Sequence, residues 1–545
     1  MINIPEFIPP ETPLPRNRVA RKPAGTREPP HDLEGTLLEL GPGLITAGAI
    51  VGSGELIATT ATGAEAGFYF MWLIIVGCLI KVFVQVEMGR FAICTGQTSL
   101  EGMSQVPGPR IGKANWVLWF WLATIIVTTA QLGGIVGGVG QALAIGAPLT
   151  KVGKEYNVIA GAETEVKANA HRFSGTGGVK PGTTDAEFKK VKDERDLFLI
   201  NLKLWLDNKD RLPELKAASK DHFIWAGIIA VVSSFLLVRG RYSFIQNFVL
   251  VLVGSFTLIT VMNVILLQTT EGYALTSEDW FAGLSFQFPP KTENVYPLAT
   301  ALATFGIIGV AAGEMVFYPY WCQEKGYARF VGPNDGSGDW VRRANGWMRV
   351  LRWDAFSAMI VYTISTVAFY ILGAAILHRA ELVPQGTEMI RTLAVMYVPI
   401  FGPLAKTIFL FGAFAVLYST FFVTNASKAR MCTDALRLFN LREDTEASRI
   451  RWLKIFCAAF PLMCFAIYCW IPFPKALVLA GGVMQSILLP VMAFTAIWFR
   501  YKKCDPRIMP GTAWDVMLWI SGIGMFIAGI WVAVTTLFPA LKAMG

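Results

Sequence analysis

The fold of this 545-residue chain is decided by a stretch near its start, GPGLITAGAIVGSGELIATT, which covers residues 41–60. The stretch is apolar enough to belong to a membrane-spanning helix, but Gly52, Ser53 and Gly54 interrupt it and Glu55 follows them directly. Glycine weakens a helix, and a carboxylate inside a bilayer is costly unless it has a task there. The stretch therefore predicts a transmembrane helix that is broken in its middle, with a functional carboxylate at the break.

A second stretch, TFGIIGVAAGEMV at residues 304–316, repeats this arrangement. Gly306 and Gly309 interrupt an apolar run, and Gly313 stands directly before Glu314. A pair of Gly-interrupted spans at corresponding places in two halves of a chain is the best sequence indication of a transporter's substrate site. We therefore expect a secondary transporter whose substrate site contains the two carboxylates.

The composition is typical of a polytopic membrane protein. Hydrophobic residues make up 54% of the chain and charged residues 16%, whereas soluble proteins contain about 25% charged residues. The net charge of +9 comes largely from Lys and Arg in short loops, so we expect a lipid bilayer and a small solute as partners rather than nucleic acid. Eleven segments are long enough to cross the hydrocarbon as helices: roughly 41–66, 68–95, 115–146, 222–238, 243–268, 297–321, 350–378, 392–425, 451–470, 475–499 and 514–538.

The charge pattern of the loops predicts the orientation. Lys and Arg concentrate in alternate short loops, which predicts a cytoplasmic N-terminus. We expect the membrane to be a plasma membrane of the bacterial inner-membrane type. Residues 1–40 are rich in proline and predict a disordered cytoplasmic tail. The polar insertion at 150–221 falls on the non-cytoplasmic side, and residues 185–206 within it predict a short helical cap.

Three more polar residues lie within the predicted spans. Lys81 stands near the middle of the second span, where it either forms a buried ion pair with one of the two carboxylates or contacts the substrate. Gln131 and Gln485, in the third and tenth spans, add neutral oxygens. The four histidines lie outside the membrane core, so a proton relay through imidazole is not expected. The sequence has no nucleotide-binding, hydrolase or disulfide pattern, so we expect neither an enzyme nor a cofactor.

Several short motifs along the spans point to a known family: Gly41-Pro42-Gly43, Trp72, Gln85, Arg90, Thr95-Gly96, Trp116 to Gly137, Leu237-Val238-Arg239-Gly240, Gly306-Ile307-Ile308-Gly309 and Leu489-Pro490. Together they make the chain resemble the NRAMP family of divalent-metal transporters from Gly41 to about Trp498. The resemblance implies an all-α LeuT-type fold of about eleven transmembrane helices, in two five-helix inverted repeats plus one extra helix. The expected limits are 41–268 for the first repeat, 269–499 for the second, and 500–545 for a loop and the final helix.

The chain departs from the pattern of this family at the substrate site. The family's Asp-Pro-Gly-Asn motif in helix one corresponds to Gly-Ser-Gly-Glu at 52–55, and its methionine ligand in helix six corresponds to Gly313. Third-span acidic positions linked to proton movement in the family are Gln131 and Gly134 here, and a second-span glycine is Lys81. Loss of the thioether and the presence of two carboxylates suit a partly hydrated Mg²⁺ better than Mn²⁺.

We expect a transporter that works by alternating access and moves a divalent cation of the Mg²⁺ or Mn²⁺ class, without proton coupling. Its candidate metal ligands are Glu55 and Glu314. The candidate substrate-binding residues are Gly52, Ser53, Gly54, Glu55, Lys81, Gln131, Gly309, Gly313, Glu314 and Gln485. Two alternatives stay open: a small organic or anionic solute on the same fold, with Lys81 in place of a coupling ion, and a non-transporting NRAMP-like sensor. The sequence also leaves the oligomeric state open.

Overall fold

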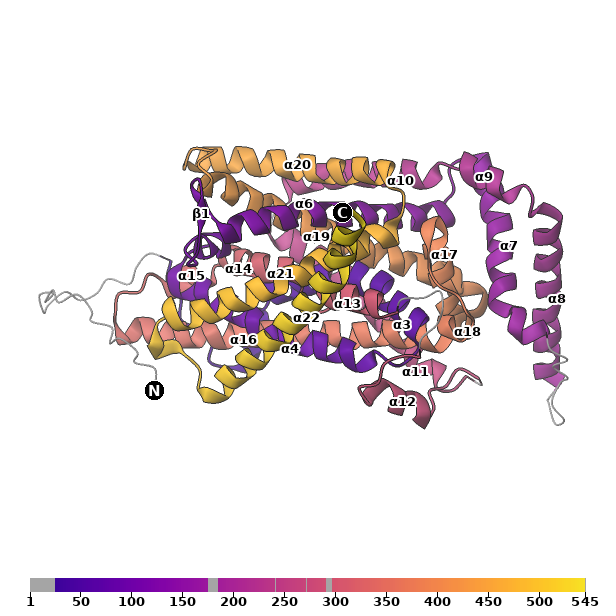
Figure 1. The fold of residues 1–545 in the computed structure, drawn as a ribbon, viewed down its shortest axis with the longest axis horizontal. Helices are drawn as coiled ribbons and strands as arrows, with labels where there is room; N and C mark the ends of the chain where they lie inside the picture. The colour runs from indigo at the N-terminus through magenta and orange to yellow at the C-terminus, as the bar shows by residue number, and fades with distance from the viewer. Residues whose placement is uncertain (1–24, 175–184, 241, 271, 291–296, 545) are drawn as a thin grey trace, which may run out of the picture.

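The computed structural model describes residues 25–174, 185–240, 242–270, 272–290 and 297–544, and it is almost wholly helical (Figure 1). Eleven helices within these residues are long and apolar enough to cross a membrane, which confirms the predicted all-α polytopic architecture. The strands are β1 (Arg110–Ile111) and β2 (Ala114–Asn115), an antiparallel pair in which Arg110 lies opposite Asn115.

Two groups of five membrane-spanning segments form the body of the protein, and an eleventh segment follows them. The first group is α2 (Pro42–Ile50) with η1 (Gly54–Thr59) and α3 (Thr60–Ala66), then α4 (Met71–Thr95), α6 (Trp116–Gly146), α10 (Asp221–Arg239) and α11 (Tyr242–Leu267). The second group is α13 (Pro297–Ile307) with α14 (Ala312–Lys325), α16 (Gly338–Leu372) with η2 (Gly373–His378), α19 (Ala405–Leu438), α20 (Glu446–Trp470) and α21 (Pro474–Lys502). The eleventh segment is α22 (Thr512–Met544).

Shorter helices connect these segments or lie at their ends. They are α1 (Leu33–Leu38), α5 (Ser99–Met103), α7 (Lys151–Ser174), α8 (Asp185–Asn208), α9 (Leu212–Ala218), α12 (Ser277–Leu284), α15 (Tyr327–Val331), η3 (Gly386–Glu388), α17 (Met389–Ala394), η4 (Val395–Tyr397), α18 (Val398–Phe401), η5 (Gly402–Leu404) and η6 (Pro506–Ile508). The domain limits expected from the sequence stay predictions.

The two broken spans lie in the centre of the helical body. The most apolar window of the first span is 94% buried and that of the sixth is 89% buried, whereas the corresponding windows of α11 and α20 are only 28% buried. A break exposes main-chain N–H and C=O groups, which hydrocarbon cannot satisfy, so irregular backbone is tolerated in a membrane only where protein or a cavity surrounds it. The central position of both breaks meets this requirement.

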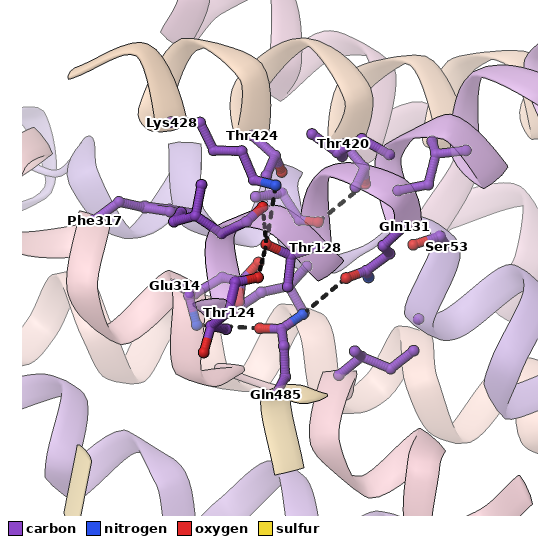
Figure 2. A pocket seen from close by; sticks show the side chains of 18 of the residues that line it. Ser53, Thr124, Thr128, Gln131, Glu314, Phe317, Thr420, Thr424, Lys428 and Gln485 are labelled. Atoms are coloured by element: carbon purple, nitrogen blue, oxygen red, sulfur yellow. Dashed lines mark hydrogen bonds between the residues drawn. The ribbon is translucent and has the colours of Figure 1, made fainter. Parts of the chain in front are cut away.

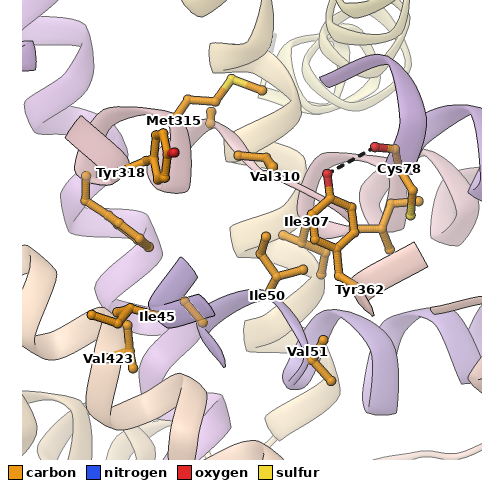
Figure 3. Packing of buried hydrophobic residues seen from close by; sticks show 14 of the residues in the cluster. Ile45, Ile50, Val51, Cys78, Ile307, Val310, Met315, Tyr318, Tyr362 and Val423 are labelled. Atoms are coloured by element: carbon orange, nitrogen blue, oxygen red, sulfur yellow. Dashed lines mark hydrogen bonds between the residues drawn. The ribbon is translucent and has the colours of Figure 1, made fainter. Parts of the chain in front are cut away.

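The first break separates α2 from η1 at residues 51–53, and apolar side chains of both broken spans pack around it, including Ile50, Val51 and Ile307 (Figure 3). The start of α2 is capped by the buried carboxylate of Asp354 on α16. Its Oδ1 accepts from the N–H of Gly41 at 2.8 Å, and its Oδ2 accepts from the N–H of Gly43 at 2.5 Å. This acceptor replaces the intrahelical partners that the first N–H groups of any helix lack.

The second break separates α13 from α14 at residues 308–311. Gly309 has a φ of +56°, and a Cβ atom there would lie 2.9 Å from the Cα of Cys78 on α4. Gly306 is equally confined, because a Cβ atom would lie 2.1 Å from the carbonyl oxygen of Gly482 on α21. Glycine is therefore required at both positions, for the left-handed backbone at one and for the close approach of a neighbouring helix at both.

The structure corrects the predicted eighth span. The sequence placed it at 392–425, but the long helix is Ala405–Leu438, and residues 389–404 form the short helices α17, η4, α18 and η5. Gly402, with a φ of +51°, ends α18 and begins η5, which leads into the long helix. Hydropathy alone does not distinguish a short apolar helix beside a span from the span itself.

Residues 25–40, which the sequence placed in the disordered tail, pack against the body of the protein. The N–H of Arg27 donates to the carbonyl of Phe330 at 3.0 Å, and the indole of Trp347 donates to the carbonyl of Arg27 at 3.0 Å. Residues 1–24 lie outside the described residues. Proline richness therefore does not prevent an ordered contact where aromatic side chains supply partners.

The insertion at 150–221 forms α7, α8 and α9, and α8 contains the predicted cap at 185–206. In Figure 1, α7 and α8 lie side by side at the end of the molecule opposite to α15 and β1. Helix α7 was not predicted. It contacts the region of α17, where Arg391 donates to the Asn157 side chain at 2.7 Å and Tyr156 hydrogen-bonds Glu388.

We expect Asp354→Asn to destabilise the protein, because an amide replaces a carboxylate that accepts from two buried N–H groups and from the Tyr318 hydroxyl at 2.9 Å. The loss should be about 1–3 kcal/mol, the cost of a lost buried hydrogen bond to a charged group. Thermal unfolding in detergent measures it. Asp339→Asn is the matched control, since it makes the same change at an exposed position in the first turn of the same helix. Equal losses for the two variants would contradict the capping role.

Candidate functional site

A cavity of about 40 Å³, enough for about three water molecules, lies between the two helix breaks (Figure 2). Its polar lining comes from five elements of the fold: the first break, α14, α6, α19 and α21. The polar groups are those of Ser53, Gly54, Thr124, Thr128, Gln131, Gly313, Glu314, Thr420, Thr424, Lys428 and Gln485. The cavity therefore joins both repeats at the place where the backbone is irregular, as expected for a transporter's substrate site.

Glu314 supplies the carboxylate of this cavity. It lies in the first turn of α14, directly after the second break, and its side chain is only 8% exposed. Its Oε2 is buried and has no hydrogen-bond partner among the described residues. A negative group in the first turn of a helix is stabilised by the helix dipole, but an unpaired buried carboxylate oxygen is costly. The cavity thus contains an anionic acceptor that a bound cation or donor would satisfy.

Glu55 has different surroundings. It lies in η1, and its Oε2 accepts from the N–H of Gly52 at 3.0 Å while the hydroxyl of Thr366 lies 3.2 Å from its Oε1. Glu314 is the carboxylate residue among the described residues that line the cavity, and Glu55 does not belong to this lining. Gly52 also lies at the break and not in the cavity lining, and a Cβ atom there would clash with the side chain of Thr420. The structure therefore does not bring the two predicted metal ligands into one lining.

Gln131 and Gln485 connect the neighbouring helices to the start of α14. The side-chain oxygen of Gln485 accepts from the N–H of Gly313 at 3.1 Å, and its side-chain nitrogen donates to the oxygen of Gln131 at 3.1 Å. Both amides line the cavity, and their role as substrate ligands stays a prediction. A Cβ atom on Gly313 would meet only the oxygen of Gln485, at 3.3 Å, so this wall of the cavity has room.

Lys81 is fully buried on α4, and its partners are main-chain carbonyls rather than either carboxylate. Its ammonium group donates to the carbonyl of Phe305 and, at 2.8 Å, to that of Ile308. The same nitrogen lies 4.6 Å from the centre of the Phe305 ring. This corrects the predicted ion pair with Glu55 or Glu314, and it places Lys81 behind the second break, near Gly309, instead of in the cavity lining.

Lys428 is a cavity residue that is not among the predicted site residues. It lies on α19, lines the cavity, and donates to the hydroxyl of Thr128 at 3.0 Å (Figure 2). It also donates to the hydroxyl of Thr129 at 3.1 Å. The predicted eighth span ends at residue 425, so this lysine lies outside it. Met431, one turn beyond Lys428, also lines the cavity. The chain lacks the family's methionine at Gly313, but Met431 brings a thioether side chain to the cavity from another helix. The described residues contain no group of three or more His, Cys, Asp or Glu side chains placed to hold a metal ion.

Comparison with known proteins supports the resemblance noted above. A family model described as Natural resistance-associated macrophage protein-like matches residues 217–537. The divalent metal cation transporter MntH of Caldanaerobacter subterraneus subsp. tengcongensis is 31% identical over 109 residues, which cover 19% of this chain and 25% of the relative. MntH of Mycobacterium tuberculosis is 25% identical over 99 residues, which cover 18% and 22%. The chain thus spans about a quarter of the length of the curated relatives it matches.

Solved structures resemble this chain over nearly its whole length. The manganese transporter of Eremococcus coleocola, in complex with an aromatic bis-isothiourea substituted compound, is 14% identical, with 94% of this chain and 90% of that chain covered and a TM-score of 0.51. MhsT in complex with L-phenylalanine is 13% identical, with 94% and 99% covered and a TM-score of 0.50. At these identities the likeness concerns the fold alone, and it confirms the predicted LeuT-type architecture of two five-helix inverted repeats.

These findings also bear on the class of protein. The eleven apolar helices and the two broken spans are those of an integral membrane protein. Because the family model matches more than half of the 545 residues, this chain belongs to the NRAMP family, a family of membrane transporters and not of enzymes.

Proposed function

We propose that this protein transports a divalent cation across the membrane by alternating access, with Glu314 as the carboxylate ligand in the cavity. The observation that supports this most is the buried Oε2 of Glu314, which has no partner among the described residues and belongs to a cavity lined by hydroxyl and amide oxygens. The names of the MntH relatives, divalent metal cation transporters, agree with a divalent cation as the substrate class.

The oxygen donors of the cavity favour a hard cation that keeps part of its water. Besides Glu314, the donors are neutral, and the Thr424 hydroxyl has no partner among the described residues. Mg²⁺ gives up its water reluctantly and binds through one or two carboxylates with several waters retained, for which a cavity of about three waters has room. Met431 also lines the cavity, and its thioether would favour Mn²⁺. We therefore propose the Mg²⁺ or Mn²⁺ class as the substrate, with preference for Mg²⁺ because oxygen atoms dominate the polar lining.

Glu55, the other candidate ligand, has a positioning role in this proposal. Its carboxylate holds the N–H of Gly52 and contacts Thr366, so it fixes the shape of the first break. It would become a ligand in another state of the cycle only after both contacts are released.

Polar contacts between helices at both ends of the helical body fit an alternating-access cycle. At the end of the first span, Lys475 of α21 lies 2.7 Å from Glu65 of α3, and both side chains are largely buried. Near the opposite end, Tyr320 of α14 donates to Asp434 of α19 at 2.7 Å, and Asp434 pairs with Arg437. In our proposal either the Lys475–Glu65 ion pair or the Tyr320–Asp434 hydrogen bond breaks when the cavity opens to its side of the membrane, while the other contact stays formed. The positive loops further suggest that the N-terminus lies in the cytoplasm, beneath a bacterial-type plasma membrane.

We expect Glu314→Gln to weaken Mg²⁺ or Mn²⁺ binding at least about tenfold, which corresponds to about 1.4 kcal/mol, because the charge is lost while the volume stays. Calorimetry on the purified protein and uptake into proteoliposomes measure binding and transport. Glu324→Gln is the matched control, since it removes the same charge from the same helix at an ion-paired, partly exposed position. Unchanged uptake by a folded Glu314→Gln protein would contradict the proposed site.

A second candidate, transport of a small organic anion, is favoured by one observation, the ammonium group of Lys428 in the cavity. Lys428→Met separates the two candidates. If the substrate is a cation, removing a resident positive charge should tighten binding several-fold; if it is an anion, binding should weaken. Lys406→Met, on the same helix but outside the cavity lining, is the control. Weaker cation binding in Lys428→Met than in Lys406→Met would count against the cation.

The driving force can be tested in the same vesicles. Membrane potential alone provides about 2.3 kcal/mol per charge per 100 mV, and a divalent cation gains twice that, so uptake needs no proton. Neutral Gln131 and the absence of an imidazole from the described cavity lining agree with this expectation. We expect uptake that follows voltage, with no change in the signal of a pH-sensitive dye inside the vesicles. Substrate-dependent acidification of the lumen that disappears in Glu314→Gln would show proton coupling instead.

A further inference from the structure

The C-terminal end of α13 has the properties of a cation-binding position. The last carbonyls of a helix have no intrahelical partners, and they form the negative end of the helix dipole. In a soluble protein water would satisfy them, but α13 ends inside the membrane body, and Phe305, Ile307 and Ile308 are nearly or completely buried. Half-helix ends and unwound carbonyls of this kind coordinate Na⁺ or protons in other transporters built from broken helices.

In this protein a lysine occupies that position. The ammonium group of Lys81 donates to the carbonyls of Phe305 and Ile308, and the ring of Phe305 lies 4.6 Å away. Two carbonyl oxygens and an aromatic face are the surroundings that stabilise a buried monovalent cation. The lysine side chain is fully buried, so no water competes from the surface.

The neighbouring glycines bring the lysine into range. A Cβ atom on Gly77, one turn before Lys81, would lie 2.9 Å from the ring of Phe305, and one on Gly309 would lie 2.9 Å from the Cα of Cys78. Helix α4 and the second break therefore approach as closely as their backbones permit. Such a close approach lets a four-carbon side chain from α4 place its nitrogen on the end of α13.

We propose that Lys81 is a tethered cation that permanently fills a monovalent cation site at the end of α13, so that this transporter needs no mobile Na⁺ there. Because the ammonium group is attached to α4, it is always present at the carbonyls, and a free ion would have to displace it. The consequence for ion coupling rests on the proposed transport function. The cation site itself does not, and its first test measures stability rather than transport.

The test compares the melting temperature of the full-length protein in detergent, at constant ionic strength, in choline chloride and in LiCl, NaCl or KCl. We expect the wild-type melting temperature to be the same in all four salts within about 1 °C. We expect Lys81→Ala to melt lower in choline chloride and to recover with one of the alkali cations, saturably and by several degrees, because the carbonyls are exposed to a cavity that the ion fills.

Lys81→Met is the matched control, since it fills the same space without a charge. It should melt lower in every salt and should not recover. A wild-type protein stabilised by Na⁺, or equal responses of the Ala and Met variants, would overturn the proposal. If Lys81→Ala cannot be purified, the melting temperatures of Lys81→Ser and of the wild-type protein in the four salts test the proposal in the same way. The Glu314→Gln variant, which has the wild-type Lys81, should also have the same melting temperature in all four salts. The cation site at Lys81 can therefore be tested separately from the proposed transport function.

Discussion

The structure depends on the satisfaction of main-chain polar groups at buried helix ends: the start of α2 and the two helix breaks inside the membrane body. Four side chains supply the hydrogen-bond partners that these main-chain groups lack. Asp354 accepts from the start of α2, and Glu55 accepts from Gly52 at the first break. Lys81 donates to the end of α13, and Gln485 accepts from the N–H of Gly313 at the start of α14. Each is matched in charge or polarity to the helix end that it meets, as the helix dipole requires.

This division of tasks leaves Glu314 as the exception on which the proposed function rests. Asp354 and Glu55 accept hydrogen bonds from main-chain N–H groups, whereas Glu314 faces a cavity and has a buried oxygen without a partner among the described residues. Lys428 also lines the cavity and donates to two threonine hydroxyls, and its positive charge repels any cation that enters. Selectivity in this site would therefore come from the balance between one carboxylate, one ammonium group and neutral oxygens, not from a closed cage of metal ligands.

Much of the fold could be predicted from the sequence because its signals are local: apolar length gives the spans, and glycine pairs give the breaks. The position of Glu314 follows from the same signal. The orientation of Glu55 does not, because its contacts with Gly52 and with Thr366 of α16 depend on the π-helical turn η1 and on tertiary packing, and residue spacing encodes neither. Lys428 was missed because the short apolar helices before residue 405 shifted the predicted eighth span. The partner of Lys81 depends on a contact between α4 and α13 that no periodicity encodes.

The most direct measurement is a structure of the protein determined in the presence of Mn²⁺, with anomalous scattering used to locate the ion. We expect one strong peak in the cavity between the two breaks, about 2.0–2.6 Å from a carboxylate oxygen of Glu314, the usual range for such ions and oxygen ligands. Neutral oxygens of the lining or water molecules would complete its coordination. A saturating concentration that gives no peak beside Glu314, or a peak held only by groups outside the cavity, would contradict the proposed site.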